Sequence, residues 1–565
     1  MPRFFLAQVA CVFVCLVSQL HAQWDAPATY YDIADGVGSQ LKGQLETAMT
    51  IGHIERRYGD FRFSASIHDQ DPFNASNICL VYTESSVVST WDSGVTWNRE
   101  HVWPQSRQPG SASNSTRGNL GDPHALRPCN PSTNSSRGNQ PFGFGDTTGP
   151  FGSLGTFWFP GDNGKGDIAR SLFYSDTRWT SLGLSLTDGV PSGNQMGDLS
   201  SMIEWHFQDP PDEFERRRNH TIFSSEFNPD YFTNNRNAYI DRPEFVWSVY
   251  VDQHNDSMIS IDGSQPVDGA SALSIDFGAV IVGGQTSLDQ SVQINKDGLD
   301  GTYYSIEAFD NAASEVTGRY NAFRMNELDG LIFDVSLDAD NSTPGINVGF
   351  VVIDNLDVTT GGGPGRGAND GDDVIDMSLA VLDHSIPSFS ATSDVESLMV
   401  DLGEVELGQE IVPFEFQVFN LGSPFGNALT ARLDLFSIDV LPQDSEISVN
   451  GSTFQDLPAG DSESFSVTGT ADELGEQNVV ILLVLSDENI PGGTSETLQL
   501  SLTYNVVEAA FLLGDVNQDG TVNLLDIEGF VALLSSGEYQ IEADINQDGS
   551  LNALDIEPFV VWLQN

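Results

Sequence analysis

Residues 97–103 read W-N-R-E-H-V-W, and residues 119–139 read N-L-G-D-P-H-A-L-R-P-C-N-P-S-T-N-S-S-R-G-N. These two stretches hold the densest chemistry in the chain. Glu100 and His101 are adjacent, so on a strand their side chains point to opposite sides, whereas at a strand end or a bend both can reach one cavity. A carboxylate beside a histidine supplies a hard ligand for Mg²⁺ and a base that titrates near neutral pH. Asn134 can add an amide oxygen to the metal.

Five arginines accompany this group within 39 residues, a density suited to binding phosphate oxygens. They are Arg99, Arg107, Arg117, Arg127 and Arg137. A metal, a base and guanidinium groups together supply water activation, charge neutralisation and leaving-group support, which are the parts of phosphodiester hydrolysis. The alternative for His101 taken alone is a structural histidine among Asn-rich loops, and the combined set argues against it.

The N-terminal part of the chain, from about residue 30 to about residue 250, resembles the bacterial secreted and periplasmic endonuclease I family of sugar-non-specific nucleases. The resemblance rests on N-R-E-H at Asn98–His101, D-P-H-A-L-R-P at residues 122–128 and N-S-S-R-G-N at residues 134–139. Further support comes from K-G-D-I-A-R at residues 165–170, W-H-x-x-D-P at 205–210, E-R-R-R-N at 215–219 and N-R-N-A-Y-I-D-R-P-E at 235–244.

The resemblance implies an α+β nuclease domain with a ββα-metal motif over residues 23–255. It also implies that His101 deprotonates the attacking water, that Glu100 and Asn134 hold a single Mg²⁺, and that the products carry 5′-phosphate ends. The family's D-L-H-N-L segment here has Pro123 and Ala125, so a role resting on that asparagine is in doubt. The candidates for contacting the scissile phosphate are Arg107, Arg117, Arg127 and Arg137.

A second basic group lies near His206 and residues 216–218. It could touch a nucleic-acid backbone. We favour a solvated helix face, on which the three consecutive arginines pair with the nearby acids Asp212, Glu213 and Glu215.

The formal charge of the chain is −58, from 23 Lys plus Arg against 81 Asp plus Glu, and this value alone argues against binding a polyanion. The charge is uneven, however. Residues 23–255 hold 17 basic and 28 acidic residues, whereas residues 256–565 hold 5 basic and 53 acidic residues. The acidic excess belongs mainly to the C-terminal part, so a nucleic-acid substrate for the N-terminal part is not excluded.

Residues 1–22 predict a secretory signal peptide, with Arg3, an apolar run to about Val17 and the small residue Ala22. An N-terminal membrane anchor is the alternative, but the run is shorter than the ~20 residues of a membrane span. No later segment is long and apolar enough to serve as a transmembrane segment. We therefore expect a secreted, extracellular protein, free or associated with a cell surface.

Four cysteines are present, of which Cys11 and Cys15 leave with the signal peptide. We predict a disulfide bond between Cys79 and Cys129, because one pair remains in an oxidising compartment. Two unconnected buried thiols are the alternative.

An internal repeat begins after about residue 266, where short alternating strands replace the mixed pattern. Residues 271–295 align with residues 397–420, and Gly278 and Gly283 match Gly403 and Gly408. The repeat predicts two all-β sandwich domains, residues 266–388 and 390–508. We interpret them as spacers or adhesion modules, because neither carries a cluster of catalytic residue types.

A second repeat closes the chain, with D-V-N-Q-D-G-T-V-N-L-L-D from Asp515 and D-I-N-Q-D-G-S-L-N-A-L-D from Asp544. Ca²⁺ takes hard oxygen ligands on flexible loops, and each twelve-residue loop supplies them at positions 1, 3, 5, 7, 9 and 12, with glycine at position 6 for the bend. The predicted calcium ligands are Asp515, Asn517, Asp519, Thr521, Asn523 and Asp526 in the first loop, and Asp544, Asn546, Asp548, Ser550, Asn552 and Asp555 in the second.

The apolar segments 527–534 and 556–563 follow these loops as amphipathic helices would. A paired EF-hand is less favoured, because position 12 is Asp rather than Glu and no entering helix is evident. The arrangement over residues 511–565 resembles a type I dockerin domain, and this resemblance implies docking onto a cohesin-type partner.

The sequence as a whole predicts a secreted, Mg²⁺-dependent endonuclease that hydrolyses DNA and RNA with little sequence specificity. Two β-sandwich domains and a small α-helical, Ca²⁺-binding, dockerin-like domain follow the nuclease domain. The main alternative from another class is a non-catalytic secreted adhesion or scaffold protein with a nucleic-acid-binding N-terminal domain.

Overall fold

The computed structural model describes residues 24–144, 148–251, 255–267, 270–359, 370–508 and 511–564. The predicted signal peptide lies outside these residues. The chain divides into two compact units, one of Met1–Phe277, Ser287–Ala339 and Val348–Ser378, the other of Gly278–Thr286, Asp340–Asn347 and Leu379–Asn565. Among the described helices, none has the length and apolar character needed to cross a membrane.

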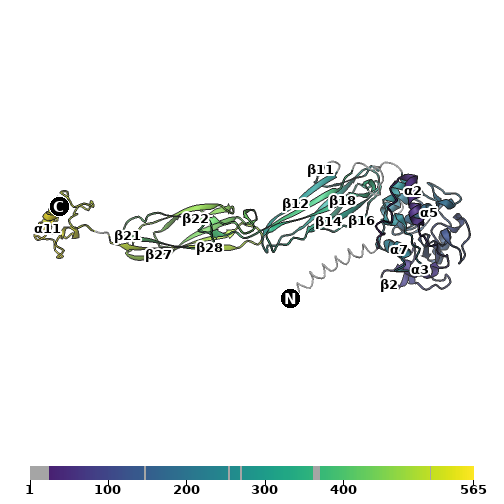
Figure 1. Cartoon of the computed structure of the whole chain (residues 1–565), viewed down its shortest axis with the longest axis horizontal. Helices are drawn as coiled ribbons and strands as arrows, with labels where there is room; N and C mark the ends of the chain where they lie inside the picture. The colour runs from purple at the N-terminus through teal and green to yellow at the C-terminus, as the bar shows by residue number, and fades with distance from the viewer. Residues whose placement is uncertain are drawn as a thin grey trace. The chain divides into compact units, whose positions relative to one another are not determined.

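The N-terminal domain, which we call the head, mixes short strands with helices (Figure 1). Its elements are α2 (Gly38–Thr50), α3 (Phe61–His68), β1 (Gln70–Asp71), β2 (Asn74–Cys79), β3 (Ser86–Val88), β4 (Asn98–His101), η1 (Gln105–Arg107), η2 (Gly118–Gly121), η3 (Pro123–Ala125), β5 (Leu126–Cys129), α4 (Pro131–Arg137), β6 (Gly152–Leu154), β7 (Phe157–Phe159), α5 (Lys165–Arg178), η4 (Thr180–Leu182), β8 (Ser185–Leu186), β9 (Gln195–Met196), α6 (Leu199–Gln208), α7 (Glu213–Phe223), α8 (Ala238–Asp241) and the π-helical turn η5 (Trp247–Val251).

Helix α5 forms the centre of the head. Thirteen of its fourteen residues are buried, so all its faces are covered by protein rather than one stripe alone. Ile168, Leu172 and Phe173 on this helix belong to a core that also includes Trp103 and Trp205. A wholly enclosed helix gives the surrounding strands and loops a fixed support.

Strands β4 and β5 and helix α4 form one ββα unit beside this core. The two strands are antiparallel, with Glu100 opposite Arg127 and His101 opposite Leu126. Asn130 caps α4, because its side chain accepts hydrogen bonds from two backbone N–H groups in the first turn. The arrangement places the N-R-E-H segment between its partner strand and a short helix.

The first β domain consists of two sheets with strand orders β10-β13-β17-β15 and β11-β12-β19-β18-β14-β16. Its strands are β10 (Met258–Ile261), β11 (Gln265–Val267), β12 (Ala270–Ile281), β13 (Asp289–Asp297), β14 (Thr302–Asp310), β15 (Ala312–Ser314), β16 (Gly318–Phe323), β17 (Leu331–Leu337), β18 (Gly345–Asn355) and β19 (Asp373–Leu382), with the short helix α9 (Leu356–Thr359). Tyr303 and Leu356 of this domain are buried in the same core as the head.

The second β domain also has two sheets, with strand orders β20-β22-β26-β24 and β21-β28-β27-β23-β25. Its elements are β20 (Pro387–Ser388), β21 (Ser397–Glu406), β22 (Phe414–Asn420), η6 (Asn427–Leu429), β23 (Leu433–Leu441), β24 (Ser448–Asn450), β25 (Phe454–Leu457), β26 (Ser462–Thr468), β27 (Gly475–Asp487) and β28 (Ser495–Val507). One hydrophobic core takes residues from both sheets, such as Val418 and Ile481.

The matched glycines of the repeat have the same backbone conformation. Gly278 and Gly403 have φ of +80° and +76°, and Gly283 and Gly408 both have φ of +80°. These values favour glycine over residues with a side chain. The repeated sequence therefore has the same backbone conformation in both copies, within a strand at Gly278 and Gly403 and in the following turn at Gly283 and Gly408.

The C-terminal module contains α10 (Asp526–Ser536), η7 (Ile541–Ala543) and α11 (Ile556–Trp562). Phe530 and Phe559 stack with ring centroids 4.1 Å apart, in a small core with Val516 and Ile545. The two predicted amphipathic segments thus form helices whose apolar faces pack on each other.

The predicted disulfide bond between Cys79 and Cys129 is absent, because both thiols are free. The backbone of Val81, and not that of Cys79, pairs with the backbone of Cys129 in an isolated parallel β-bridge. Cys79 lies two residues earlier, and at about 3.3 Å per residue and ~4.8 Å between strands its Cα lies roughly 8 Å from that of Cys129. A disulfide bond needs Cα atoms closer than about 7 Å. The alternative of two unconnected thiols is the arrangement found.

Candidate active site

Strand β4 carries Glu100 and His101 on opposite faces, and it ends at His101. Glu100 faces Tyr82 and Arg137, whereas His101 faces Tyr58. The structure therefore gathers the predicted site residues in two groups that meet at the end of one strand.

His101 is held by a backbone carbonyl and an aromatic ring. Its Nε2 lies 3.1 Å from the carbonyl oxygen of Leu120, and its ring stacks on that of Tyr58 with centroids 4.9 Å apart. Because a carbonyl only accepts hydrogen bonds, Nε2 must carry the proton and Nδ1 keeps a lone pair. Burial lowers the pKa of His101 to about 4. The enclosed ring is therefore neutral near pH 7, and Nδ1 is the nitrogen that can accept a proton.

Glu100 is a buried carboxylate, and the described residues that donate hydrogen bonds to it both do so to the same oxygen. Oε1 accepts from the hydroxyl of Tyr82 at 2.8 Å and from Arg137 at 3.0 Å. Burial raises the pKa of Glu100, and Arg137 and Tyr82 oppose this effect. Both hydrogen bonds given to Glu100 end on Oε1, so Oε2 is the oxygen left for a further ligand.

Helix α4 presents Asn134 and Arg137, one turn apart, to the backbone of β4. Asn134 Nδ2 donates to Asn98 Oδ1 at 2.9 Å and to the Arg99 carbonyl at 3.4 Å. Arg137 donates to the carbonyl oxygens of His101 and Val102. The amide nitrogen of Asn134 is thus used by the protein, and its oxygen is turned away from these acceptors.

These residues fit a hard divalent cation. The donor set is a carboxylate oxygen of Glu100 with no hydrogen bond and an amide oxygen of Asn134, both of the kind that Mg²⁺ prefers. Mg²⁺ usually keeps several waters and takes only one or two protein ligands, so two oxygens suffice.

The candidate arginines divide into buried and accessible ones. Arg137 pairs with Glu100, and the buried Arg127 pairs with Asp167 at 2.7 Å. Arg107 and Arg117 are half-buried and donate to backbone carbonyls. Arg107 and Arg117 are therefore the candidates whose guanidinium groups remain available to a phosphate.

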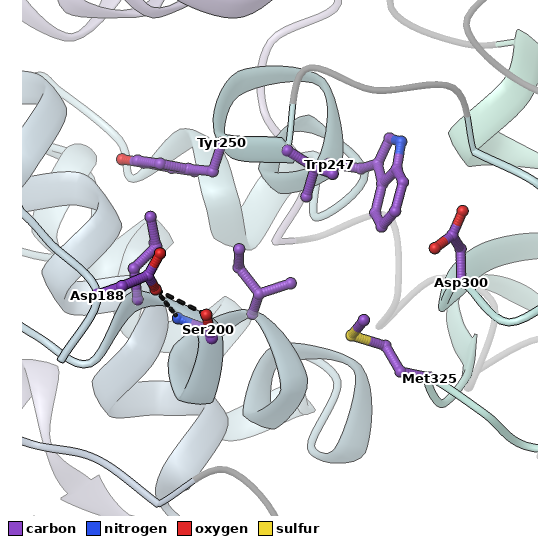
Figure 2. Close-up of a pocket in the computed structure, with 9 residues that line it drawn as sticks. Asp188, Ser200, Trp247, Tyr250, Asp300 and Met325 are labelled. Carbon is purple, nitrogen blue, oxygen red and sulfur yellow. Dashed lines mark hydrogen bonds between the residues drawn. The ribbon is translucent and has the colours of Figure 1, made fainter.

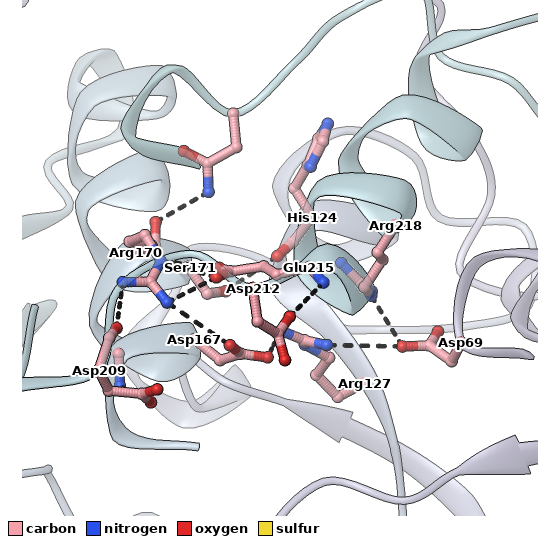
Figure 3. Close-up of polar contacts among 12 residues, drawn as sticks. Asp69, His124, Arg127, Asp167, Arg170, Ser171, Asp209, Asp212, Glu215 and Arg218 are labelled. Atoms are coloured by element: carbon pink, nitrogen blue, oxygen red, sulfur yellow. Dashed lines mark hydrogen bonds and ion pairs between the residues drawn. The ribbon is translucent and has the colours of Figure 1, made fainter. Parts of the chain in front are cut away.

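Behind β5, a buried polar network joins motifs that lie far apart in the sequence (Figure 3). Arg170 donates through Nε to both carboxylate oxygens of Glu215, at 3.0 and 2.8 Å, and Arg218 binds Asp69 at 2.7 Å. Arg127 links this network to the strand opposite Glu100. These contacts hold β5 in position. The arginines in them are paired with carboxylates and are therefore not available to bind a phosphate.

The prediction that residues 216–218 lie on a solvent-exposed helix face is wrong for two of the three arginines. α7 is a helix, but Arg216 and Arg218 are buried, because partners from distant parts of the chain pair with them. His206 is fully buried, and its Nε2 lies 2.8 Å from the carbonyl oxygen of Pro243. Burial lowers the pKa of His206 well below its usual value.

Two cavities, one lined partly by the first β domain, lie apart from His101. One, of about 310 Å³, is lined by Trp247, Tyr250, Asp188 and Asp300, but Asp188 already accepts from Ser200 (Figure 2). The other, of about 560 Å³, is lined by five acids and by Arg127, which pairs with two of them, so its net negative charge would repel a phosphate chain. Those acids are Asp69, Asp71, Glu84, Asp167 and Asp212.

Three contacts of the site were not anticipated from the sequence. Tyr58 stacks on His101, Tyr82 binds Glu100, and the Leu120 carbonyl binds His101. These partners are distant from Glu100 and His101 in the sequence. A single tyrosine or a backbone carbonyl does not form a sequence motif that would reveal such a contact. The E-R-R-Y stretch at residues 55–58, with two arginines beside an aromatic residue, was the one available indication.

The two calcium-loop candidates have closely similar geometry. Asp526 accepts from the backbone N–H groups of Asn517 and Asn523, and Asp555 accepts from the equivalent groups in the second loop. The loops also place Gly520 and Gly549 at φ of +86° and +80°. Carboxylates and amide oxygens collect around each bend, and this oxygen set fits Ca²⁺.

Comparison with known proteins gave matches at both ends of the chain. The family model described as Endonuclease I matches residues 38–244, and the one described as Dockerin type I domain matches residues 513–558. The extracellular ribonuclease of Bacillus amyloliquefaciens is 35% identical over 242 residues, covering 39% of this chain and 78% of the relative. That of Bacillus subtilis (strain 168) is 35% identical over 236 residues, with the same coverage.

A solved structure also matches, at low similarity. The adhesive subunit of the CFA/I fimbria of enterotoxigenic Escherichia coli has 8% identity and a TM-score of 0.21, covering 45% of this chain and 88% of that chain. Similarity at this level supports no argument about fold or function.

Proposed function

Because the chain belongs to the endonuclease I family of nucleases, we propose that its head hydrolyses internal phosphodiester bonds of DNA and RNA with little sequence specificity. The products carry 5′-phosphate ends. The observation that supports this most directly is the position of His101 at the end of β4, with Nε2 bound to the Leu120 carbonyl and Glu100 as its neighbour.

Glu100 and Asn134 would hold Mg²⁺, which when bound neutralises charge on the phosphate and supports the departing 3′ oxygen. His101 Nδ1 takes a proton from water, and the water oxygen forms a bond to phosphorus while the bond from phosphorus to the 3′ oxygen breaks. The 3′ oxygen leaves as a hydroxyl after taking a proton from solvent. Arg137 positions Glu100 and the backbone of residues 101–102.

Residues 511–564 act as the docking module, with a cohesin-type protein as partner. Apolar side chains related by the 29-residue repeat are exposed on it, including Leu525 with Leu554 and Val531 with Val560. Exposed apolar groups of this kind mark protein-binding surfaces. The nuclease acts outside the cell, free or at a cell surface, as its extracellular relatives and its docking module suggest.

The deciding experiment compares the wild type with His101→Ala in a plasmid-nicking assay, in Mg²⁺ and in EDTA. We expect nicking by the wild type in Mg²⁺ only, and a loss of at least 100-fold in the variant, as general-base removal predicts. His384→Ala, which changes a histidine that pairs with Asp487 of the second β domain, is the matched control. Substantial cleavage by folded His101→Ala would overturn the assignment, and binding without cleavage by the wild type would favour the scaffold alternative.

A further inference from the structure

Residues 55–63, E-R-R-Y-G-D-F-R-F, pack against the segment that ends at the acceptor of His101. The Tyr58 N–H donates to the Thr116 carbonyl at 2.8 Å, and the Gly59 N–H donates to the Asn114 carbonyl at 3.1 Å. Gly121, next to Leu120, approaches the Arg56 carbonyl so closely that a Cβ there would lie 2.4 Å from it. The two segments therefore form one continuous surface that begins at His101.

This surface carries five of the head's arginines. They are Arg56, Arg57, Arg62, Arg99 and Arg117. In the part of the chain that the structure describes, none of the five makes an ion pair, whereas the arginines of the buried network each pair with a carboxylate. The acids placed nearby are Glu55, Asp60, Asp230 and Glu100, the last of which pairs with Arg137. Arginines therefore outnumber the unpaired acids here although the chain is strongly acidic.

Aromatic rings alternate with these arginines. The Arg99 guanidinium lies 3.7 Å above the Tyr58 ring, and that ring also stacks on His101. Further out, the Arg62 guanidinium lies 5.2 Å from the ring of Phe63, which is 52% exposed. Phe63 in turn lies nearly parallel to Tyr231, with centroids 6.3 Å apart and an interplanar angle of 19°.

We propose that this surface, from Tyr58 and Arg99 at His101 to Phe63 and Tyr231, binds single-stranded nucleic acid and leads it to the site. The inference rests on the proposed function and names the form of its substrate. Arginines follow the phosphates, and an unstacked base lies on the exposed ring of Phe63. Bases within a duplex are already stacked on each other, so a surface of this composition binds a single strand better than a duplex.

The first test measures binding without cleavage, in the His101→Ala background with Mg²⁺. Fluorescence anisotropy is read with a 15-nucleotide RNA, the same DNA single strand and the DNA duplex. Phe63→Ala should weaken binding of both single strands by about 5- to 150-fold, the loss expected for one stacked base, and weaken duplex binding by much less. Phe63→Tyr keeps a ring and should restore binding. Phe73→Ala, which removes an aromatic ring that is 96% exposed elsewhere on the head, should change nothing.

The second test measures the phosphate contacts. Arg62→Gln should reduce the slope of log affinity against log salt concentration by about 0.7 for a single strand, because one counterion-releasing contact is lost. Arg432→Gln, an exposed arginine of the second β domain, is the charge-matched control. An unchanged slope in Arg62→Gln would show that Arg62 does not contact a phosphate of the bound strand.

The outcomes separate this inference from the proposed function. If the wild type cleaves nucleic acid but Phe63→Ala binds single strands as tightly as the unsubstituted surface does, the proposed binding surface is contradicted. The nuclease assignment is then unaffected. If the wild type cleaves nothing, the nuclease assignment fails whatever the binding data show. Equal losses for RNA and DNA single strands support recognition of bases and phosphates, whereas a loss confined to one strand or equal for strand and duplex contradicts it.

Discussion

The ring Nε2 of His101 and the carbonyl oxygen of Leu120 are 3.1 Å apart, and this contact determines which ring nitrogen can take a proton. The carbonyl belongs to η2, which packs against residues 56–58 through Gly121. The orientation of the proposed base thus depends on a close backbone approach as well as on the stacked ring of Tyr58.

Gly121→Ala should therefore impair catalysis without removing any catalytic group. A Cβ would lie 2.4 Å from the Arg56 carbonyl oxygen and 2.9 Å from the Tyr58 nitrogen, so the backbone must shift and move the Leu120 carbonyl with it. We expect kcat to fall by about 10- to 100-fold, since small misplacements at a reacting centre cost this much. Gly43→Ala, at an exposed helical position with open space around it, is the control and should keep full activity.

Tyr82→Phe tests whether Glu100 is a metal ligand. The Tyr82 hydroxyl donates to Glu100 Oε1 at 2.8 Å and orients the carboxylate. Removing an outer hydrogen bond of this kind typically lowers metal affinity by about 10- to 100-fold. The Mg²⁺ concentration for half-maximal cleavage should rise by that factor, while activity at saturating Mg²⁺ stays near that of the wild type. An unchanged Mg²⁺ dependence would contradict the assignment of Glu100.

The buried pair of Arg170 and Glu215 should be important for stability and not for chemistry. Glu215→Gln leaves the buried Arg170 charge with only its longer ion pair, 3.6 Å to Asp167, and we expect a loss of about 3–5 kcal/mol in the free energy of unfolding. Replacing both residues by Met and Leu removes both charges and should recover much of that loss. Urea unfolding of the wild type, Arg170→Met, Glu215→Leu and the double variant of Arg170→Met with Glu215→Leu gives the double-mutant cycle. Additive losses would show that the two residues do not act as a pair.

The sequence indicated which candidate residues lie close together along the chain, and it did not indicate long-range pairing. Glu100, His101 and Asn134 lie within one ββα unit, so their proximity follows from a short stretch of chain. The calcium loops are likewise complete within twelve residues each, and the repeat shows the pattern twice. Information confined to a short segment is readable without the rest of the fold.

Exposure of charged residues could not be read in the same way. Three consecutive arginines on a helix are typical of a solvated face, yet Arg218 is buried because Asp69, 149 residues away, pairs with it. The prediction of a disulfide bond between Cys79 and Cys129 was wrong for a similar reason. The pairing of Val81 with Cys129 depends on how segments that are distant in the sequence meet. Tertiary partners decide such cases, and no local pattern specifies them.

Asp373 should make the first β domain less stable as pH rises. Burial and the neighbouring acids Asp370 and Asp372 raise its pKa to about 7, although Ser271 opposes this with two hydrogen bonds. The folded form therefore holds a proton that the unfolded chain loses near pH 4, so stability falls between about pH 4 and pH 7 and then levels off. The slope is at most about 1.4 kcal/mol per pH unit.

Asp373→Asn tests this directly, because the amide cannot ionise. Thermal unfolding of the full chain from pH 4.5 to 8 should show a flatter dependence in the variant, with a higher midpoint than the wild type at pH 8. Asp376→Asn, an exposed carboxylate on the same strand, is the control. A profile of Asp373→Asn identical to that of the wild type would rule out this carboxyl as the source.

Calcium should be required for folding of residues 511–564. The small core around Phe530 and Phe559 brings Asp515, Asp526 and the other carboxylates together, and without a cation these charges repel. Circular dichroism of this segment should show helix in Ca²⁺, loss of helix in EGTA and recovery on adding Ca²⁺ back. Asp526→Asn should raise the Ca²⁺ concentration for half-folding at least tenfold, whereas Glu528→Gln, exposed on α10, should not. A helical signal that survives EGTA unchanged would show that the loops fold without the ion.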